Sequence, residues 1–125
     1  MRNILLSLLL LSSSVTSLAG EADVLSAKIE DMGGGNYRFD VTIQHADEGW
    51  EHFAKAWVVL APDGKILGTR VLRHPHTHKP FTRSSTIAIP EGINEVTIRA
   101  YDQVHEFGGK ELTIEIHKEK QNDIN

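Results

Sequence analysis

Hydrophobic and polar residues alternate along most of the chain after the first twenty positions. In the segment YRFDVTIQH, apolar side chains occupy every second position from Tyr37 to Ile43, and polar side chains lie between them. This period of two is typical of a β-strand with one buried face, and the segments VTIRAYD and LTIEI repeat it. The segment AWVVLA, residues 56–61, is apolar on both faces, which is typical of a strand in the middle of a sheet.

Turn sequences separate these segments. Pro62-Asp63-Gly64 predicts a hairpin turn, after which the chain returns as another strand. Together the patterns and turns predict seven strands, at about residues 24–30, 37–45, 56–61, 66–72, 82–89, 96–102 and 112–116. With no long helical segment between them, they predict an all-β fold: a single antiparallel seven-stranded β-sandwich of the immunoglobulin or fibronectin type III kind.

The N-terminal segment has a different pattern. Arg2 precedes an apolar run from Ile4 to Leu11, and small residues follow up to Ala19. This layout is typical of a secretory signal peptide, here residues 1–19, cleaved near Ala19. We therefore expect a β-sandwich domain over residues 20–118 and a polar C-terminal tail over residues 119–125. The protein would be periplasmic or secreted, with no membrane contact after cleavage.

Composition narrows the possible functions. The chain carries 13 basic and 17 acidic side chains, a net charge of −4, which argues against a nucleic-acid partner. It contains no cysteine, so disulfides, thiol catalysis and thiolate metal sites are excluded. Ser84 and Ser85 lie near histidines, but no nucleophile-elbow motif surrounds them. We expect a binding protein rather than an enzyme.

The histidines follow the predicted topology. If consecutive strands are antiparallel, the segments HADEGWEHFAK, RHPHTHKPF and DQVHEFGGK all lie at the same end of the sandwich. These three loops contain six of the seven histidines: His45, His52, His74, His76, His78 and His105. The turns at the opposite end contain none, so the end with the three loops is the candidate binding site.

Neutral imidazole is the commonest nitrogen ligand for divalent transition metals. In the extended segment His74-Pro75-His76, the two rings project to the same side and can converge on one ion. We therefore predict a site for Cu(II) or Zn(II) whose ligands are His74, His76 and His105, with His45 as a further ligand.

Other polar side chains of the same loops could hydrogen-bond the ligating rings or bind directly. These are Asp47, Asp102, His52 and His78. The alternative is a structural hydrogen-bond network of histidines that holds the three loops together without a metal. The protein would then be a non-enzymatic interaction module. Its partner is accordingly either a metal ion or another envelope protein, and the oligomeric state is not specified by the sequence.

One resemblance covers residues 21–116. The sequence HADEGWEHFAKAWVVLAPDGKILGTRVLRHPH, followed by PFTRS, IPEG and DQVHEFGG, resembles a family of small exported bacterial proteins with an HPH loop and a D-x-V-H loop. That resemblance implies a periplasmic single domain and no particular activity. The predicted sandwich is also similar, in fold alone, to periplasmic copper-resistance sandwiches. Those typically use a histidine at the mature N-terminus, whereas cleavage after Ala19 leaves Gly20 here.

Overall fold

The structure, a computed structural model, describes residues 22–45, 52–75 and 80–117. It contains seven strands: β1 (Asp23–Gly33), β2 (Asn36–Gln44), β3 (Ala54–Leu60), β4 (Ile66–Val71), β5 (Phe81–Ala88), β6 (Glu95–Asp102) and β7 (Leu112–Glu115). The expected signal peptide and C-terminal tail lie outside the described residues. Among those that are described, no helix is long and apolar enough to cross a membrane.

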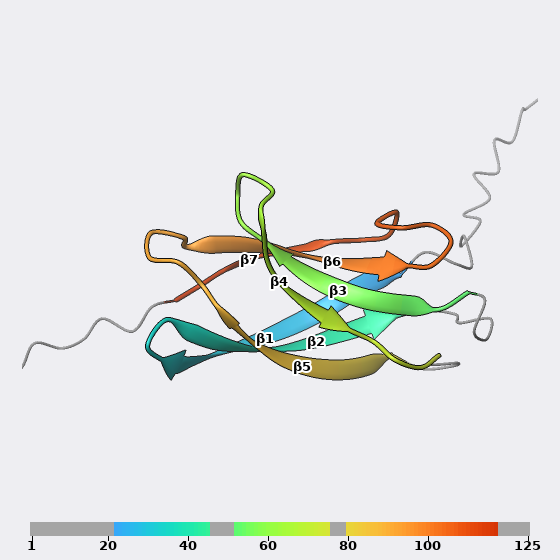
Figure 1. The fold of residues 1–125 in the computed structure, drawn as a ribbon, viewed down its shortest axis with the longest axis horizontal. Coiled ribbons are helices and arrows are strands. Elements are labelled where there is room, and N and C mark those ends of the chain that lie inside the picture. The colour runs from blue at the N-terminus through green and yellow to red at the C-terminus, as the bar shows by residue number, and fades with distance from the viewer. Residues whose placement is uncertain (1–21, 46–51, 76–79, 118–125) are drawn as a thin grey trace, which may run out of the picture.

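The strands form two antiparallel sheets, which Figure 1 shows as two layers. One sheet has the order β1-β2-β5, and the other has the order β4-β3-β6-β7. The predictions of an all-β fold and of seven antiparallel strands are therefore confirmed. The strand limits differ from the expected ones by a few residues, mainly because β1 extends to Gly33.

The core lies between the two sheets. In β2 the side chains from Tyr37 to Ile43 that share one face are buried, as their period of two predicts. From the other sheet, Trp57 and Val59 of β3 and Ile98 of β6 are fully buried and belong to the same hydrophobic cluster. Burial of each such side chain stabilises the fold by about 1.5–3 kcal/mol, so this cluster supplies the main stability of a chain without disulfides.

Strands β2, β4 and β6 all end at the same end of the molecule (Figure 1). The registers agree, because Ile43 near the end of β2 pairs with Phe81 of β5. Likewise Asp102 at the end of β6 pairs with Ala54 at the start of β3. The ends of these three strands therefore lie at one end of the two-sheet structure, as the antiparallel topology predicts.

The loop after β6 packs directly against the start of β1. The backbone N–H of Lys110 donates to Asp23 Oδ1 at 2.7 Å, and that of Val24 donates to the Lys110 carbonyl at 2.8 Å. Gly109 allows this approach, because a Cβ atom there would lie 1.9 Å from the carbonyl oxygen of Ala22. These contacts fix the β6–β7 loop, which carries part of the candidate site.

Candidate metal centre

Asp102 is the last residue of β6 and is completely buried. It shares the inward-facing parity of Val96, Ile98 and Ala100, so the strand itself points its side chain into the protein. A short loop then reverses the chain, with the N–H of Asp102 donating to the Glu106 carbonyl and the N–H of Glu106 donating to the Asp102 carbonyl, both at 2.9 Å.

This loop holds one oxygen of the Asp102 carboxylate. Oδ1 accepts the backbone N–H groups of Val104 and His105, each at 2.7 Å. The Nδ1 atom of the His105 ring lies 3.3 Å from the same oxygen. Because three nitrogens of this loop lie close to Oδ1, the orientation of the carboxylate is fixed, and the other oxygen, Oδ2, contacts other parts of the chain.

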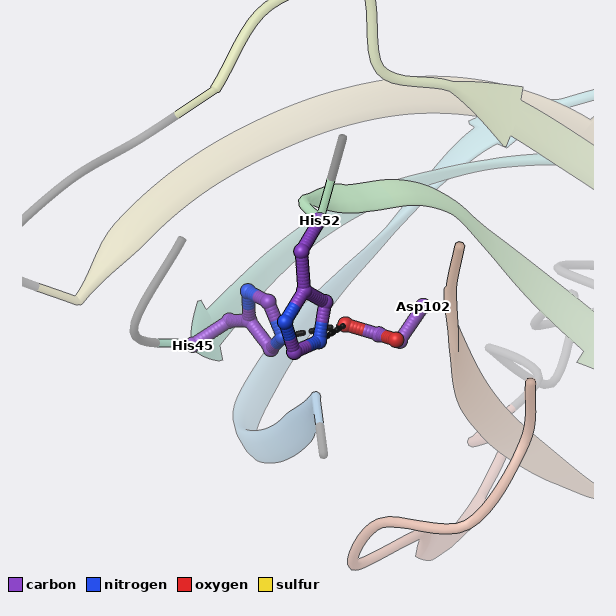
Figure 2. Close-up of side chains that lie close together, drawn as sticks. All are labelled: His45, His52 and Asp102. Carbon is purple, nitrogen blue, oxygen red and sulfur yellow. Dashed lines mark ion pairs between the residues drawn. The ribbon is translucent and has the colours of Figure 1, made fainter. Parts of the chain in front are cut away.

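Two histidines meet at Oδ2. The Nε2 atom of His52 lies 2.9 Å from it, and the Nε2 atom of His45 forms an ion pair with the same oxygen. Figure 2 shows both rings directed at one carboxylate from different segments of the chain. The ring centroids of His45 and His52 are 5.1 Å apart, with an angle of 73° between the planes.

The local structure explains why both rings reach this point. His45 follows β2 and keeps the inward-facing parity of Ile43, so it continues the core face beyond the strand. His52 lies two residues before Ala54, which pairs with Asp102. The N–H of Gln103 donates to the carbonyl of Phe53 at 3.1 Å, which joins the segment of His52 to the loop after β6.

The electrostatics favour an ionised carboxylate. Burial raises the pKa of Asp102, but the N–H groups of His105 and Val104 and the charges of His45 and His52 outweigh burial and lower it. Even so, Oδ2 is buried and accepts no hydrogen bond of good geometry from the described residues. A buried negative charge in this position requires a cation, which can be a proton on an imidazole or a metal ion.

The three side chains also satisfy the donor requirements of a metal site. His45, His52 and Asp102 each offer one ligand atom, and these atoms all lie within 4.8 Å of one another. Four ligands at about 2.0–2.1 Å from a tetrahedral ion lie about 3.3 Å apart. The 2.9 Å contact between His52 and Asp102 would lengthen by about half an ångström to admit the ion. Two nitrogens and one oxygen suit Zn(II) or Cu(II) and leave a coordination position open.

The structure distributes the predicted site residues over more than one location. His45 was predicted as a ligand, and His52 and Asp102 as supporting residues; these three lie together. His105 lies beside them: its Nδ1 atom is 3.3 Å from Asp102 Oδ1, and its ring centroid is 5.1 Å from that of His52. His74 is exposed and lines a separate pocket with Arg70, Arg73 and Arg83. His76, His78 and Asp47 lie outside the described residues, so a ligand role for His74-Pro75-His76 stays a prediction.

Sequence reasoning did not place Asp102 at the centre, although a signal for it was present. Its parity with Val96, Ile98 and Ala100 puts a carboxylate on the buried face of β6, which is unusual unless it is paired. No comparable pattern marks His52, because it lies outside the strands and its position depends on how the chain enters β3.

Together these features define a class of protein: an all-β domain of two antiparallel sheets with a buried His-His-Asp cluster at one end. The chain is similar to a protein of Halomicrobium mukohataei named "Putative lipoprotein", with 40% identity over 95 residues. The match covers 76% of this chain and 47% of the relative, so the chain spans about half of the relative's length. No family model and no solved structure matches the chain.

Proposed function

We propose that the protein is an exported envelope protein that binds a divalent transition metal, Zn(II) or Cu(II), through His45, His52 and Asp102. One observation carries the proposal: the Nε2 atoms of two buried histidines converge on one oxygen of a fully buried carboxylate. The role is binding rather than catalysis.

A metal ion would account for two features of this cluster. A buried carboxylate oxygen without a good hydrogen bond gains a strong partner if a cation lies between it and the two rings. The N–H groups that hold Oδ1 are also the kind of support that orients a carboxylate ligand, leaving Oδ2 to face the ion. Nε2 is a ligand atom whenever the ring proton is on Nδ1.

Two further observations support the exported location and the detailed fold. The name of the relative, together with the expected signal peptide of residues 1–19, supports a protein of the cell envelope. The strand order β1-β2-β5 and β4-β3-β6-β7 supports a sandwich of the fibronectin type III kind, because β4 pairs with β3 rather than with β5.

The metal proposal is tested by calorimetric titration of the untagged, metal-free protein with Zn(II) and with Cu(II), combined with thermal unfolding. We expect one ion per chain. At a free metal concentration one hundred times Kd, binding stabilises the fold by about 2.7 kcal/mol, which raises the Tm of a domain of this size by about 10 °C or more.

Variants assign the binding to the cluster. His45→Ala and Asp102→Asn should abolish the heat of binding and the rise in Tm, because the first removes a ligand atom and the second removes the negative charge of the carboxylate ligand. His117→Ala is the matched control, because His117 is exposed and follows β7 at the opposite end of the molecule. His74→Ala tests the HPH segment: loss of binding in this variant, with binding retained in Asp102→Asn, would contradict the proposed site.

The second candidate is an interaction module in which the cluster is purely structural. It is favoured by the ion pairs that His45 and His52 already form with Asp102, which satisfy the carboxylate's charge if an imidazole is protonated. In that case, neither metal would produce a saturable heat. Asp102→Asn would lower Tm by the same amount with and without metal, and the partner would be another envelope protein.

A further inference from the structure

Two arginines occupy core-facing positions on neighbouring edge strands. In β4, Arg70 shares the parity of Gly68 and of Leu72, which is buried. In β5, Arg83 shares the parity of Phe81 and Ile87, which are both buried. Core-facing positions of a strand are normally occupied by apolar residues. The two partly buried guanidinium groups at these positions therefore require a physical explanation.

The two strands belong to different sheets but lie against each other. A Cβ atom on Gly68 would come within 2.7–2.8 Å of the Ile87 side chain, which shows how closely β4 approaches β5. Between these strands is a pocket of about 120 Å³ lined by Arg70, Leu72, Arg73, His74 and Arg83. This pocket therefore combines three guanidinium groups and an imidazole in a chain with a net charge of −4.

The hydrogen bonding of the arginines orients them and leaves one of them incompletely paired. Arg70 Nη1 donates to the carbonyl of Val71 at 2.9 Å, and Arg83 Nη1 donates to the carbonyl of Thr82 at 2.7 Å. The Nε atom of Arg70 is buried and has no hydrogen-bond partner among the residues that the structure describes. Over the described ranges, neither Arg70 nor Arg73 forms an ion pair with a carboxylate.

We propose that this pocket binds a small oxyanion, a phosphate or a carboxylate group. Guanidinium groups bind both through paired, charge-assisted hydrogen bonds, and an oxyanion would supply the missing acceptor for Arg70 Nε. The volume corresponds to about four water molecules, which fits such a group but not a nucleotide. The competing explanation is that inward-pointing charges only protect these edge strands from pairing with another chain.

The test uses ¹⁵N-labelled, metal-free protein and sodium phosphate or sodium acetate as separate probes, with sodium chloride at matched ionic strength as reference. The Nε–Hε resonance of Arg70 should move saturably with at least one oxyanion and not with chloride. A response to phosphate alone or to acetate alone assigns the ligand class. A linear response, equal for all three salts, would leave only the edge-protection role and overturn the proposal.

Two variants sharpen this result. Arg73→Gln changes an exposed side chain that the fold does not need, and it should weaken binding by about tenfold, the effect of one charge-assisted hydrogen bond. Arg38→Gln is the control, because Arg38 lies on β2 outside the pocket and pairs with Asp40. Unchanged affinity in Arg73→Gln would contradict the site.

The Asp102→Asn variant should bind the oxyanion normally, so failure of the metal proposal would not affect this one.

Discussion

At the scale of single residues, Asp102 shows how backbone geometry can assign different roles to the two oxygens of a carboxylate. The loop after β6 holds Oδ1 with two N–H groups, while Oδ2 receives the rings of His45 and His52. A long, freely rotating acidic side chain could not be fixed in this way, and the shortness of aspartate makes the i+2 and i+3 N–H groups accessible. The site depends on this local turn as much as on the histidines.

A second carboxylate, Asp40 on β2, gives a prediction about pH. The pKa of Asp40 is lowered mainly by the Ser84 hydroxyl, which donates a hydrogen bond to Asp40 Oδ1. Burial raises this pKa, and the nearby Arg38 lowers it further. A carboxyl group whose pKa is lower in the folded state than in the unfolded chain stabilises the fold. This stabilisation is complete at pH values above the pKa of the group in the unfolded chain, which is about 3.9. That contribution is lost as the pH falls through the lowered, folded-state value.

Ser84→Ala should therefore reduce the free energy of unfolding at pH 7 and have a smaller effect as the pH falls below about 4. Urea unfolding of the variant and the wild type at pH 7, 4 and 2.5 measures this difference. Thr86→Ala, on the same strand and exposed, is the control. A difference between Ser84→Ala and the wild type that stays constant with pH would show that the hydroxyl does not act through the charge of Asp40.

At the scale of elements, the end of the molecule that carries the cluster is held by the β6–β7 loop. This loop hydrogen-bonds to β1 of the other sheet through Lys110, so it joins the two layers beside Asp102. The approach depends on Gly109, where a side chain has no room.

Gly109→Ala should lower the free energy of unfolding by about 2 kcal/mol, because a Cβ atom 1.9 Å from the Ala22 carbonyl forces the loop away from β1. Chemical denaturation measures the loss. Lys110→Ala serves as the neighbouring control, because it changes an exposed side chain and keeps both backbone hydrogen bonds. Equal stabilities of Gly109→Ala and the wild type would mean that the loop is not fixed in this way.

The elements were predictable from the sequence because β-strands impose a simple period. The alternation from Tyr37 to Ile43 and the turn at Pro62-Asp63-Gly64 specify strands and connections without reference to the rest of the chain. The site was predictable only where that period continues into it, as at His45. The position of His52 depends on the contact of Phe53 with Gln103, which no local pattern encodes.

At the scale of the whole molecule, two chemically different features lie at the end of the molecule where β4 and β6 both end. The acidic centre at Asp102 lies inside the protein and suits a cation. The arginine pocket between β4 and β5 opens to the surface and suits an anion. Antiparallel topology brings the connecting segments of both sheets to one end, so a small domain can carry both without an additional element.

Ligation of the metal by His45 and His52 is tested most directly by ¹⁵N spectroscopy of the histidine rings. Long-range ¹H–¹⁵N spectra are recorded for the metal-free protein and after one equivalent of Zn(II). We predict that the Nε2 resonances of His45 and His52 shift to the values of metal-bound nitrogen, while those of His74 and His117 do not move. Unchanged His45 and His52 resonances, or metal-induced shifts confined to His74, His76 and His78, would contradict the account.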